Sequence, residues 1–218
     1  MNIINQRLAS LREVMKREHL AAFIFPSTDA HQSEYVADHW LGRAWLSGFN
    51  GSAGTAVVTM TSAALWTDSR YFLAAEEQLQ GTEFQLMKLK IPGTPSIAEW
   101  LGKELADVSS PEVGLDGWVN SYVSTSRLIA DLRREGGITV RTNFDPLKEI
   151  WTERPAIPEN PIEIQPIEYA GEGVSSKIER IRKALRASHA DGMLVSALDD
   201  IAWTLNLRGT DVHCNPVF

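Results

Sequence analysis

The residues most suited to take part in chemistry lie between Trp45 and Phe72. This stretch carries three evenly spaced glycines, Gly48, Gly51 and Gly54. Ser52 lies among these glycines, so a serine nucleophile is the first chemistry to consider. A nucleophile elbow needs Gly-x-Ser-x-Gly between a strand and a helix. Here Asn50 takes the first glycine position, and the loop precedes a strand-like run. The pattern therefore favours a structural turn, and it also fails the Gly-x-Gly-x-x-Gly pattern of dinucleotide sites.

Arg70 is the second candidate, because it follows the apolar run Ala63–Trp66 and stands where a helix is expected to begin. Thr67, Asp68 or Ser69 can cap that helix. The planar guanidinium matches carboxylate or carbonyl oxygens, and strand-to-helix junctions are where α/β sheets often meet ligands. The alternative is an arginine paired with Asp68 or with a carboxylate of another domain. Position by itself leaves both roles open and defines no reaction.

Other side chains that can ligate a metal form two loose clusters, namely His31, Glu34, Asp38 and His39, and further on Asp211, His213 and Cys214. The first has helical spacing, but His-x-x-Glu without a second paired histidine is a weak metal pattern. A solvated helix face is the favoured interpretation, and the second cluster is discounted in the same way. Asp199 and Asp200 suit a turn or a helix cap better than a carboxylate pair. We therefore predict no catalytic residue and no metal ligand within this chain.

Composition sets the outer limits of function. The 218 residues suit one or two domains, and a hydrophobic fraction of 44% suffices for a folded core. A net charge of −7 with scattered lysines and arginines argues against nucleic acid as a partner. A single cysteine, Cys214, suits a reducing compartment, and the first residues lack the features of a secretory signal. Without an apolar run of about 20 residues, a membrane span is not expected. We predict a cytoplasmic protein.

The elements that position Arg70 follow from hydrophobic spacing. Short unbroken apolar runs bounded by turn residues predict strands, and runs with helical spacing predict helices. Strands are expected near 21–25, 56–58, 63–66, 84–89, 113–115 and 138–141, and helices near 5–18, 70–80, 94–105, 121–134 and 145–151. The two runs around 59–62 predict a β-hairpin, and Thr94 and Pro95 are expected at the start of their helix. The order predicts an α/β fold with a mixed sheet flanked by helices.

The last third of the chain resembles its beginning. Residues 152–173 carry four prolines and read as an extended linker. Beyond it, Lys177-Ile178 repeats Arg7-Leu8, and Met193-Leu194-Val195 stands where Phe23-Ile24-Phe25 stands in the first copy. Trp203 to Gly209 likewise echoes Trp45 to Gly51. The pattern predicts a domain at 1–151, the linker, and an incomplete second domain of the same type at 174–218. A longer gene product is therefore expected.

Several stretches, in order and over nearly the whole chain, resemble cytosolic-type Xaa-Pro aminopeptidases (aminopeptidase P), the three-domain members of the creatinase and prolidase superfamily. The stretches are Pro26–Tyr35, Ser47–Thr55, Leu65–Phe72, Ile150–Pro155, Ala197–Trp203, Asn206–Val212 and Asn215–Phe218.

The resemblance implies a parent enzyme that removes the residue preceding a proline from the N-terminus of peptides. It implies that the first two domains share a ribonuclease-H-like motif fold. A third, pita-bread domain holds two divalent metals, usually manganese, on two aspartates, a histidine and two glutamates. That catalytic domain is absent from the present sequence. The resemblance further implies that the first domain restricts access to the active site and takes part in homodimer contacts. Arg70 occupies the position of a substrate-binding arginine in the family's Thr-Asp-x-Arg-Tyr block.

The leading hypothesis is therefore a non-catalytic N-terminal part of a metal-dependent Xaa-Pro aminopeptidase, with Arg70 as its substrate-binding residue. The alternative is a stand-alone peptide-binding or protein-interaction module without catalytic activity. A third hypothesis, a serine hydrolase using Ser52, requires a reactive hydroxyl that the sequence pattern does not favour.

Overall fold

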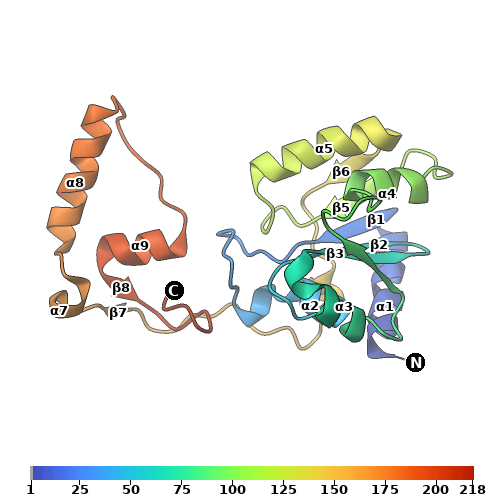
Figure 1. Ribbon diagram of the computed structural model, residues 1–218, viewed down its shortest axis with the longest axis horizontal. Coiled ribbons are helices and arrows are strands. Elements are labelled where there is room, and N and C mark those ends of the chain that lie inside the picture. Colours follow the sequence, from blue (N-terminus) through green and yellow to red (C-terminus); the bar gives the residue numbers. More distant parts are fainter. Residues whose placement is uncertain (1) are drawn as a thin grey trace.

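The computed structural model describes residues 2–218 of the chain. A six-stranded sheet organises the first two thirds of the chain (Figure 1). The strand order is β4-β3-β2-β1-β5-β6. The strands are β1 (Ala22–Phe25), β2 (Thr55–Thr59), β3 (Ala63–Thr67), β4 (Phe84–Lys88), β5 (Glu112–Leu115) and β6 (Thr139–Arg141). β2 runs antiparallel to β1 and β3, whereas the other neighbouring pairs are parallel. The predicted α/β class with a mixed sheet is confirmed.

Helices cover both faces of this sheet (Figure 1). They are α1 (Ile3–Arg17), α2 (Gly42–Ser47), α3 (Phe72–Gln78), α4 (Ile97–Glu104), α5 (Tyr122–Gly136) and α6 (Leu147–Ile150). Side chains of α1, α2, α3 and α6 pack in one apolar cluster, and those of α4 and α5 pack in another. Strand β1 contributes side chains to both clusters, with Phe23 in the first and Ile24 in the second. A strand buried on both faces explains the unbroken apolar run in the sequence.

Helix α1 shows how local sequence sets an element. Asn2 accepts a hydrogen bond from the backbone N–H of Ile4 at 2.9 Å and so caps the first turn. Ile4, Leu8, Leu11 and Met15 recur at helical spacing and are buried against the sheet. Burying each of these side chains contributes about 1.5–3 kcal/mol relative to exposure.

Helix α4 begins two residues later than the sequence predicts. Its N-cap is Ser96, whose hydroxyl accepts from the Glu99 backbone N–H at 3.2 Å, while the Glu99 carboxylate accepts from the Ser96 N–H at 2.7 Å. This reciprocal capping box satisfies two backbone donors that Thr94 and Pro95 cannot satisfy together. The prediction of Thr94 as the cap is therefore wrong. Pro95 instead offers its carbonyl to the indole N–H of Trp66 at 2.8 Å.

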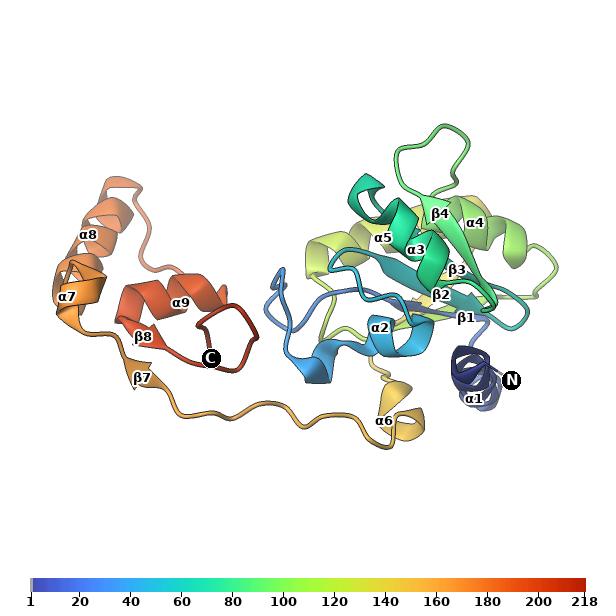
Figure 2. The same ribbon diagram turned by 60° about the horizontal axis from the view of Figure 1, so that its bottom comes forward.

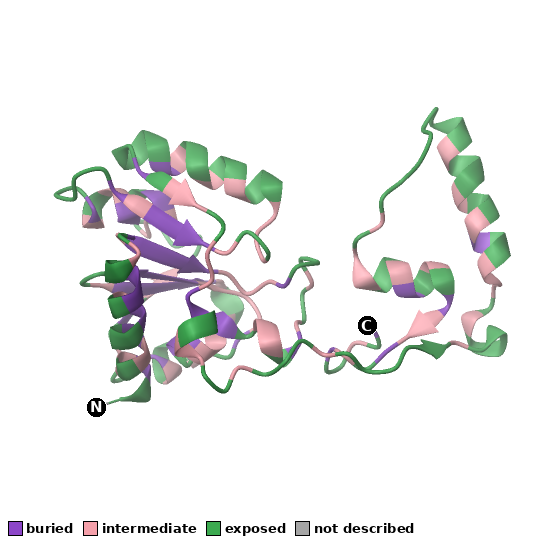
Figure 3. Ribbon diagram, turned by 180° about the vertical axis from the view of Figure 1, so that it is seen from behind, coloured by how far each residue is buried: buried purple, intermediate pink, exposed green. Residues whose placement is uncertain are grey.

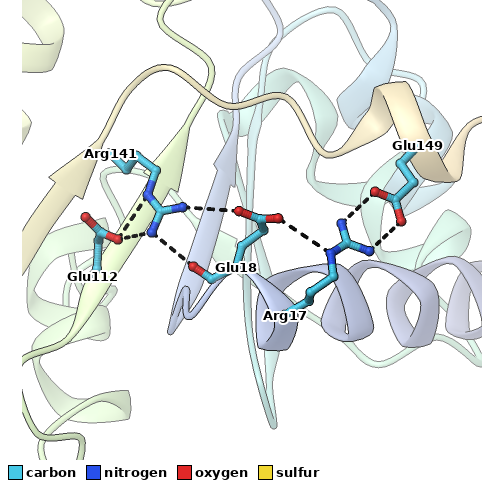
Figure 4. A network of polar contacts seen from close by, with 5 residues as sticks. All are labelled: Arg17, Glu18, Glu112, Arg141 and Glu149. Atoms are coloured by element: carbon cyan, nitrogen blue, oxygen red, sulfur yellow. Dashed lines mark hydrogen bonds and ion pairs between the residues drawn. The ribbon is translucent and has the colours of Figure 1, made fainter.

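A chain of charged side chains ties α1, β5, β6 and α6 together (Figure 4). Arg17 makes two hydrogen bonds with Glu149, at 2.7 and 2.6 Å, and lies 3.5 Å from Glu18. Arg141 donates to the Glu18 backbone carbonyl at 3.0 Å and pairs with Glu112. Arg17 and Glu149 are more than half exposed, so solvent screens their ion pair and it contributes little to stability, whereas Arg141, Glu18 and Glu112 are less than a third exposed.

The remaining residues form a smaller part with little sheet. Its elements are β7 (Glu163–Ile164), α7 (Ile167–Ala170), α8 (Val174–Ala187), α9 (Leu198–Leu205) and β8 (Leu207–Arg208), with β7 antiparallel to β8. An extended stretch connects α6 to β7 (Figure 2). Residues 193–195, the counterpart of β1 in the sequence repeat, form no strand, and Leu194 is 93% exposed. Within residues 2–218 no neighbouring strand pairs with them. Figure 3 shows the contrast between the buried sheet and the exposed α8.

The two parts nevertheless share helix-end geometry. His19 follows α1 and His189 follows α8, and both adopt left-handed backbone conformations, with φ of 57° and 52°. The backbone hydrogen bonds around them match: Leu20 donates to Met15 and Ala190 donates to Leu185. Left-handed residues after a helix satisfy its last carbonyls, a geometry that glycine adopts most easily.

The parts also share a cation–tryptophan contact. Arg7 donates to the Trp45 carbonyl and lies 4.4 Å from the centre of the Trp45 ring. Lys177 donates to the Trp203 carbonyl at 2.7 Å and lies 4.3 Å from the centre of that ring. The paired residues are the ones that the sequence repeat aligns. The same contact therefore joins α1 to α2 in the first part and α8 to α9 in the second.

The left-handed conformation of His19 generates a stability prediction. His19 is exposed, so replacing it with glycine removes the cost of a Cβ in this conformation and little else. We expect His19→Gly to raise the free energy of unfolding by about 0.5 kcal/mol, measured by urea denaturation, after the entropy cost of glycine is deducted. His19→Ala keeps the Cβ and serves as the control. A midpoint for the glycine variant at or below that of the alanine variant would contradict this account.

Candidate functional site

The candidate site lies where β3 ends and the chain turns into a short 3-10 helix, η2 (Ser69–Tyr71), followed by α3. Asp68 is the N-cap of η2, and its carboxylate accepts from the Arg70 backbone N–H at 3.0 Å. Asp68 is one of the three caps that the sequence allows, and its short acceptor side chain suits the position. The turn places Arg70 at the surface beside the end of the sheet.

The Arg70 guanidinium is bound to Asp68. Nε donates to Oδ1 at 3.0 Å and Nη2 donates to Oδ2 at 2.9 Å, and the group lies 5.2 Å from the centre of the Tyr71 ring. Hydrogen bonding with Asp68 raises the pKa of Arg70 and lowers the pKa of Asp68. The pairing that the sequence analysis kept as the structural alternative is therefore present. The Arg70 side chain is 62% exposed, and its Nη1 makes no hydrogen bond within residues 2–218, so that edge faces solvent.

Tyr71 joins Arg70 to the glycine-rich loop. Its hydroxyl lies 2.8 Å from the Ser52 hydroxyl, and its ring packs edge-on against Phe49 with centroids 5.9 Å apart. A Cβ at Gly51 would lie 2.4 Å from Phe49 and 2.7 Å from Tyr71, so only glycine fits between these rings. The Ser52 hydroxyl is hydrogen-bonded to the Tyr71 hydroxyl rather than to a basic imidazole. This arrangement does not activate a serine nucleophile.

A buried arginine holds the same loop from inside. Arg43, in α2, is 4% exposed and donates Nε to the Ser27 hydroxyl at 2.9 Å. Its Nη1 and Nη2 donate to the backbone carbonyls of Phe49 and Gly51, and the group lies 4.9 Å from the centre of the Phe49 ring. Burial lowers the pKa of Arg43 to about 10. Sequence reasoning missed this residue, because no local pattern shows that the glycine-rich loop folds over it.

Between this loop and the last residues of the chain lies a cavity of about 390 Å³. Its lining residues come from the segment 34–44, from the loop at 50–52 and from His213 and Cys214. The cavity therefore spans the two parts of the chain. Nearby, Ala37 shares an apolar cluster with Ala202, Val212 and Val217, which holds the parts together at this point.

The predicted metal-capable residues are not brought together. His31 hydrogen-bonds the Ser196 carbonyl through Nδ1 at 2.8 Å, and His39 hydrogen-bonds the Pro155 carbonyl through Nδ1 at 2.7 Å. Burial lowers the pKa of His39. Within residues 2–218, no three histidines, cysteines, aspartates or glutamates lie close enough to hold a metal ion. The residues present do not fit a divalent metal centre. His31 instead joins the first part of the chain to the second, and His39 holds the start of the connecting stretch.

Arg154 fastens the start of the connecting stretch. Its Nη1 donates to the Asp145 carboxylate at 2.6 Å and its Nε donates to the His39 carbonyl at 3.0 Å. The guanidinium lies 5.9 Å from the centre of the Trp40 ring and 5.7 Å from that of Trp151. Only 11% of the Arg154 side chain and 9% of the Asp145 side chain are exposed. This contact joins residues of three separate segments, which their sequence positions did not reveal.

The fold and these motifs define the class of protein. The family model described as the Creatinase/Prolidase N-terminal domain matches residues 7–147, and a second model of the same description matches residues 153–218. The chain therefore belongs to the creatinase/prolidase N-terminal domain family.

Its relatives include named peptidases. A probable Xaa-Pro aminopeptidase P of Talaromyces marneffei is 42% identical over 215 residues, which cover 98% of this chain and 32% of that protein. Aminopeptidase P2 of Arabidopsis thaliana is 41% identical over 221 residues, covering 99% of this chain and 30% of that protein. The chain spans about a third of the length of these relatives. The resemblance to the N-terminal portion of aminopeptidase P is confirmed.

Solved structures agree. X-prolyl aminopeptidase from Caenorhabditis elegans, described as a cytosolic enzyme with a di-nuclear active site, is 33% identical with a TM-score of 0.89. The match covers 100% of this chain and 36% of that chain. Aminopeptidase P from Streptococcus thermophilus has a TM-score of 0.50 at 20% identity, covering 69% of this chain and 100% of that chain, which shows the shared fold alone. Among the residues that our structure describes, no helix is long and apolar enough to cross a membrane.

The buried guanidinium of Arg43 generates a second prediction. Arg43→Met keeps most of the side-chain volume but leaves the Phe49 and Gly51 carbonyls without their donors. We expect the free energy of unfolding to fall by about 2–4 kcal/mol, because unsatisfied buried acceptors cost more than the hydrogen bonds contribute. Arg43→Lys restores part of the loss by reaching one acceptor. Equal stability of the wild type and the methionine variant in urea denaturation would show that the loop does not depend on Arg43.

Proposed function

We propose that this chain is the non-catalytic N-terminal part of a metal-dependent Xaa-Pro aminopeptidase, an enzyme that removes the N-terminal residue preceding a proline. The observation that carries the proposal is the similarity of nearly the whole chain to one portion of much longer Xaa-Pro aminopeptidases. In this proposal residues 1–151 and 174–218 belong to two domains of one type, joined by a linker at 152–173. The contacts shared by Arg7 with Trp45 and by Lys177 with Trp203 support that division.

The chemistry of water activation then belongs to another part of the parent protein. We propose that this other part holds two divalent metals and that these are manganese. The di-nuclear active site described for the Caenorhabditis elegans relative supports the number of metals. The chain described here supplies no residues toward those metals. Its proposed role is to form a wall of the peptide-binding chamber, to restrict which peptides enter, and to contribute to homodimer contacts. A cytoplasmic location is proposed, since the same relative is described as cytosolic.

Arg70 is the residue that we propose touches the substrate. Its Nη1 edge faces solvent, and its ion pair with Asp68 is exposed, so solvent or a ligand can compete for the guanidinium at small cost. A bound peptide would place a carboxylate or a carbonyl oxygen, on the far side of its proline, against that edge. Such a contact orients the scissile bond without taking part in the reaction.

The proposed division of labour is tested by comparing purified residues 1–218 with a full-length product of the same reading frame. We expect the full-length enzyme to cleave peptides with proline at the second position, with Mn²⁺ present, and residues 1–218 to show no turnover. Turnover by residues 1–218 would contradict the proposal. A reading frame that stops after Phe218 would instead favour a stand-alone peptide-binding or protein-interaction module.

The role of Arg70 has its own test in the full-length enzyme. We expect Arg70→Ala to lower kcat/KM by about tenfold, mainly by raising KM, because one charge-assisted hydrogen bond of about 1.5 kcal/mol is lost. Arg70→Lys should recover part of the loss. Asp107→Asn, which removes an exposed charge from the loop after α4, serves as the control. Unchanged kinetics for Arg70→Ala across peptides of different length would remove Arg70 from the binding site.

A further inference from the structure

The cavity between the two parts of the chain has features of a binding site for a side chain. Much of its wall is apolar, and its lining includes Tyr35, Leu41 and Ala44. Tyr35 and Leu41 are exposed, at 52% and 39%, so their side chains are accessible from this cavity. A concave surface of about 390 Å³ with apolar walls and a few polar groups is typical of small ligand pockets.

Two carboxylates lie in the lining of this cavity, and one of them, that of Glu34, is near enough to Arg70 for their charges to interact. Glu34 and Asp38 are exposed, and neither side chain makes an ion pair or a hydrogen bond within residues 2–218. The guanidinium in the lining, that of Arg43, is buried and donates to the neutral oxygens of Ser27, Phe49 and Gly51, so its positive charge offsets part of the charge of the two carboxylates. The exposed charges in the lining, those of Glu34 and Asp38, are both negative, and a cationic group is their electrostatic complement.

The cavity is adjacent to Arg70. Ser52 lines it and hydrogen-bonds Tyr71, whose ring in turn lies against the Arg70 guanidinium. Glu34 is also close enough to raise the pKa of Arg70. One tyrosine side chain therefore separates Arg70 from the cavity, a span that about two or three residues of extended peptide cover at ~3.3 Å each.

The charges around Arg70 favour one kind of contact over the other. Asp68 already binds the guanidinium, and Glu34 adds a second negative charge nearby. A free carboxylate arriving at Nη1 would be repelled by both, whereas a neutral peptide carbonyl would not. A carbonyl at Arg70 means that the peptide continues beyond this point. The cavity is then within reach of the next residues, since Tyr71 alone lies between Arg70 and the Ser52 wall.

We infer that the cavity between Glu34–Ala44, the loop at 50–52 and His213–Cys214 binds a downstream part of the substrate peptide. Its ligand is an apolar side chain flanked by a lysine or arginine, a few residues beyond the one whose carbonyl meets Arg70. The inference rests on the proposed function, and it names a specificity that the proposed function does not contain. The apolar side chain fills the walls, and the basic residue pairs with Glu34 and Asp38.

The test uses full-length enzyme and a host peptide of proline at the second position followed by glycines. A phenylalanine–lysine pair is moved one position at a time along the residues after proline, and a phenylalanine–glutamate pair is moved in the same way. At one register we expect the lysine peptide to have a KM roughly threefold to tenfold lower than the glutamate peptide, as two exposed ion pairs allow. High salt should reduce this preference.

Two sets of variants separate the parts of the site. The substitutions Glu34→Gln and Asp38→Asn together should abolish the lysine preference. They should change KM least for a tripeptide that does not reach the cavity. Ala44→Phe should fill the cavity and remove the KM advantage of the phenylalanine–lysine peptide over a peptide with glycine–lysine at the same register. Asp107→Asn is the matched control and should change neither preference.

The possible failures are distinguishable. If the wild-type enzyme cleaves no peptide of the series, the proposed function fails and the inference fails with it. If it cleaves all peptides equally, or if the charge variants keep the lysine preference, the proposed function stands and the cavity is not a peptide site. Should Ala44→Phe fail to fold, the two charge variants decide the outcome.

Discussion

The geometry of the candidate site depends on one buried cation. Removing the Arg43 guanidinium from water is costly, and no carboxylate within residues 2–218 is bound to it. Three oxygen acceptors and the face of Phe49 offset the cost, provided that the glycine-rich loop adopts one conformation. That conformation brings the Phe49 ring against Tyr71, with Gly51 between them. Tyr71 then supports Arg70 at the surface. Because burial of Arg43 requires one loop conformation, it also fixes the position of Arg70 at the surface.

Much of the fold could be predicted because it rests on local patterns. The unbroken apolar runs of β1, β2 and β3 reflect burial on both faces, and short polar turns mark their ends. The position of Arg70 at a strand-to-helix junction follows from the same pattern, since Asp68 caps the turn that it precedes. These features need only the period of hydrophobicity and the chemistry of a cap. The family resemblance added the class of protein, which periodicity does not encode.

What could not be predicted depends on contacts between distant segments. Sequence gives no signal that Arg154 meets Asp145 and the carbonyl of His39, because each of these groups is ordinary in its own segment. Arg43 reads as a surface residue of a short helix until the glycine-rich loop folds over it. The cap of α4 was misplaced for a smaller reason, since the reciprocal bond between Ser96 and Glu99 outcompetes the neighbouring Thr94. Tertiary approach decided the first two, and local competition decided the third.

The two parts of the chain are coupled through the segment that also lines the cavity. Residues 29–40 accept the Arg154 guanidinium through His39 and meet the second part through His31 and Ala37. The same segment contributes Glu34 and Asp38 to the cavity, while His213 and Cys214 complete it from the other side. A ligand that bridges both walls must therefore stabilise the relative position of the two parts, and contacts between the parts, such as that of His31 with Ser196, must favour the ligand in return. Ligand binding in the cavity and the packing of one part on the other are therefore linked, so that each makes the other more favourable.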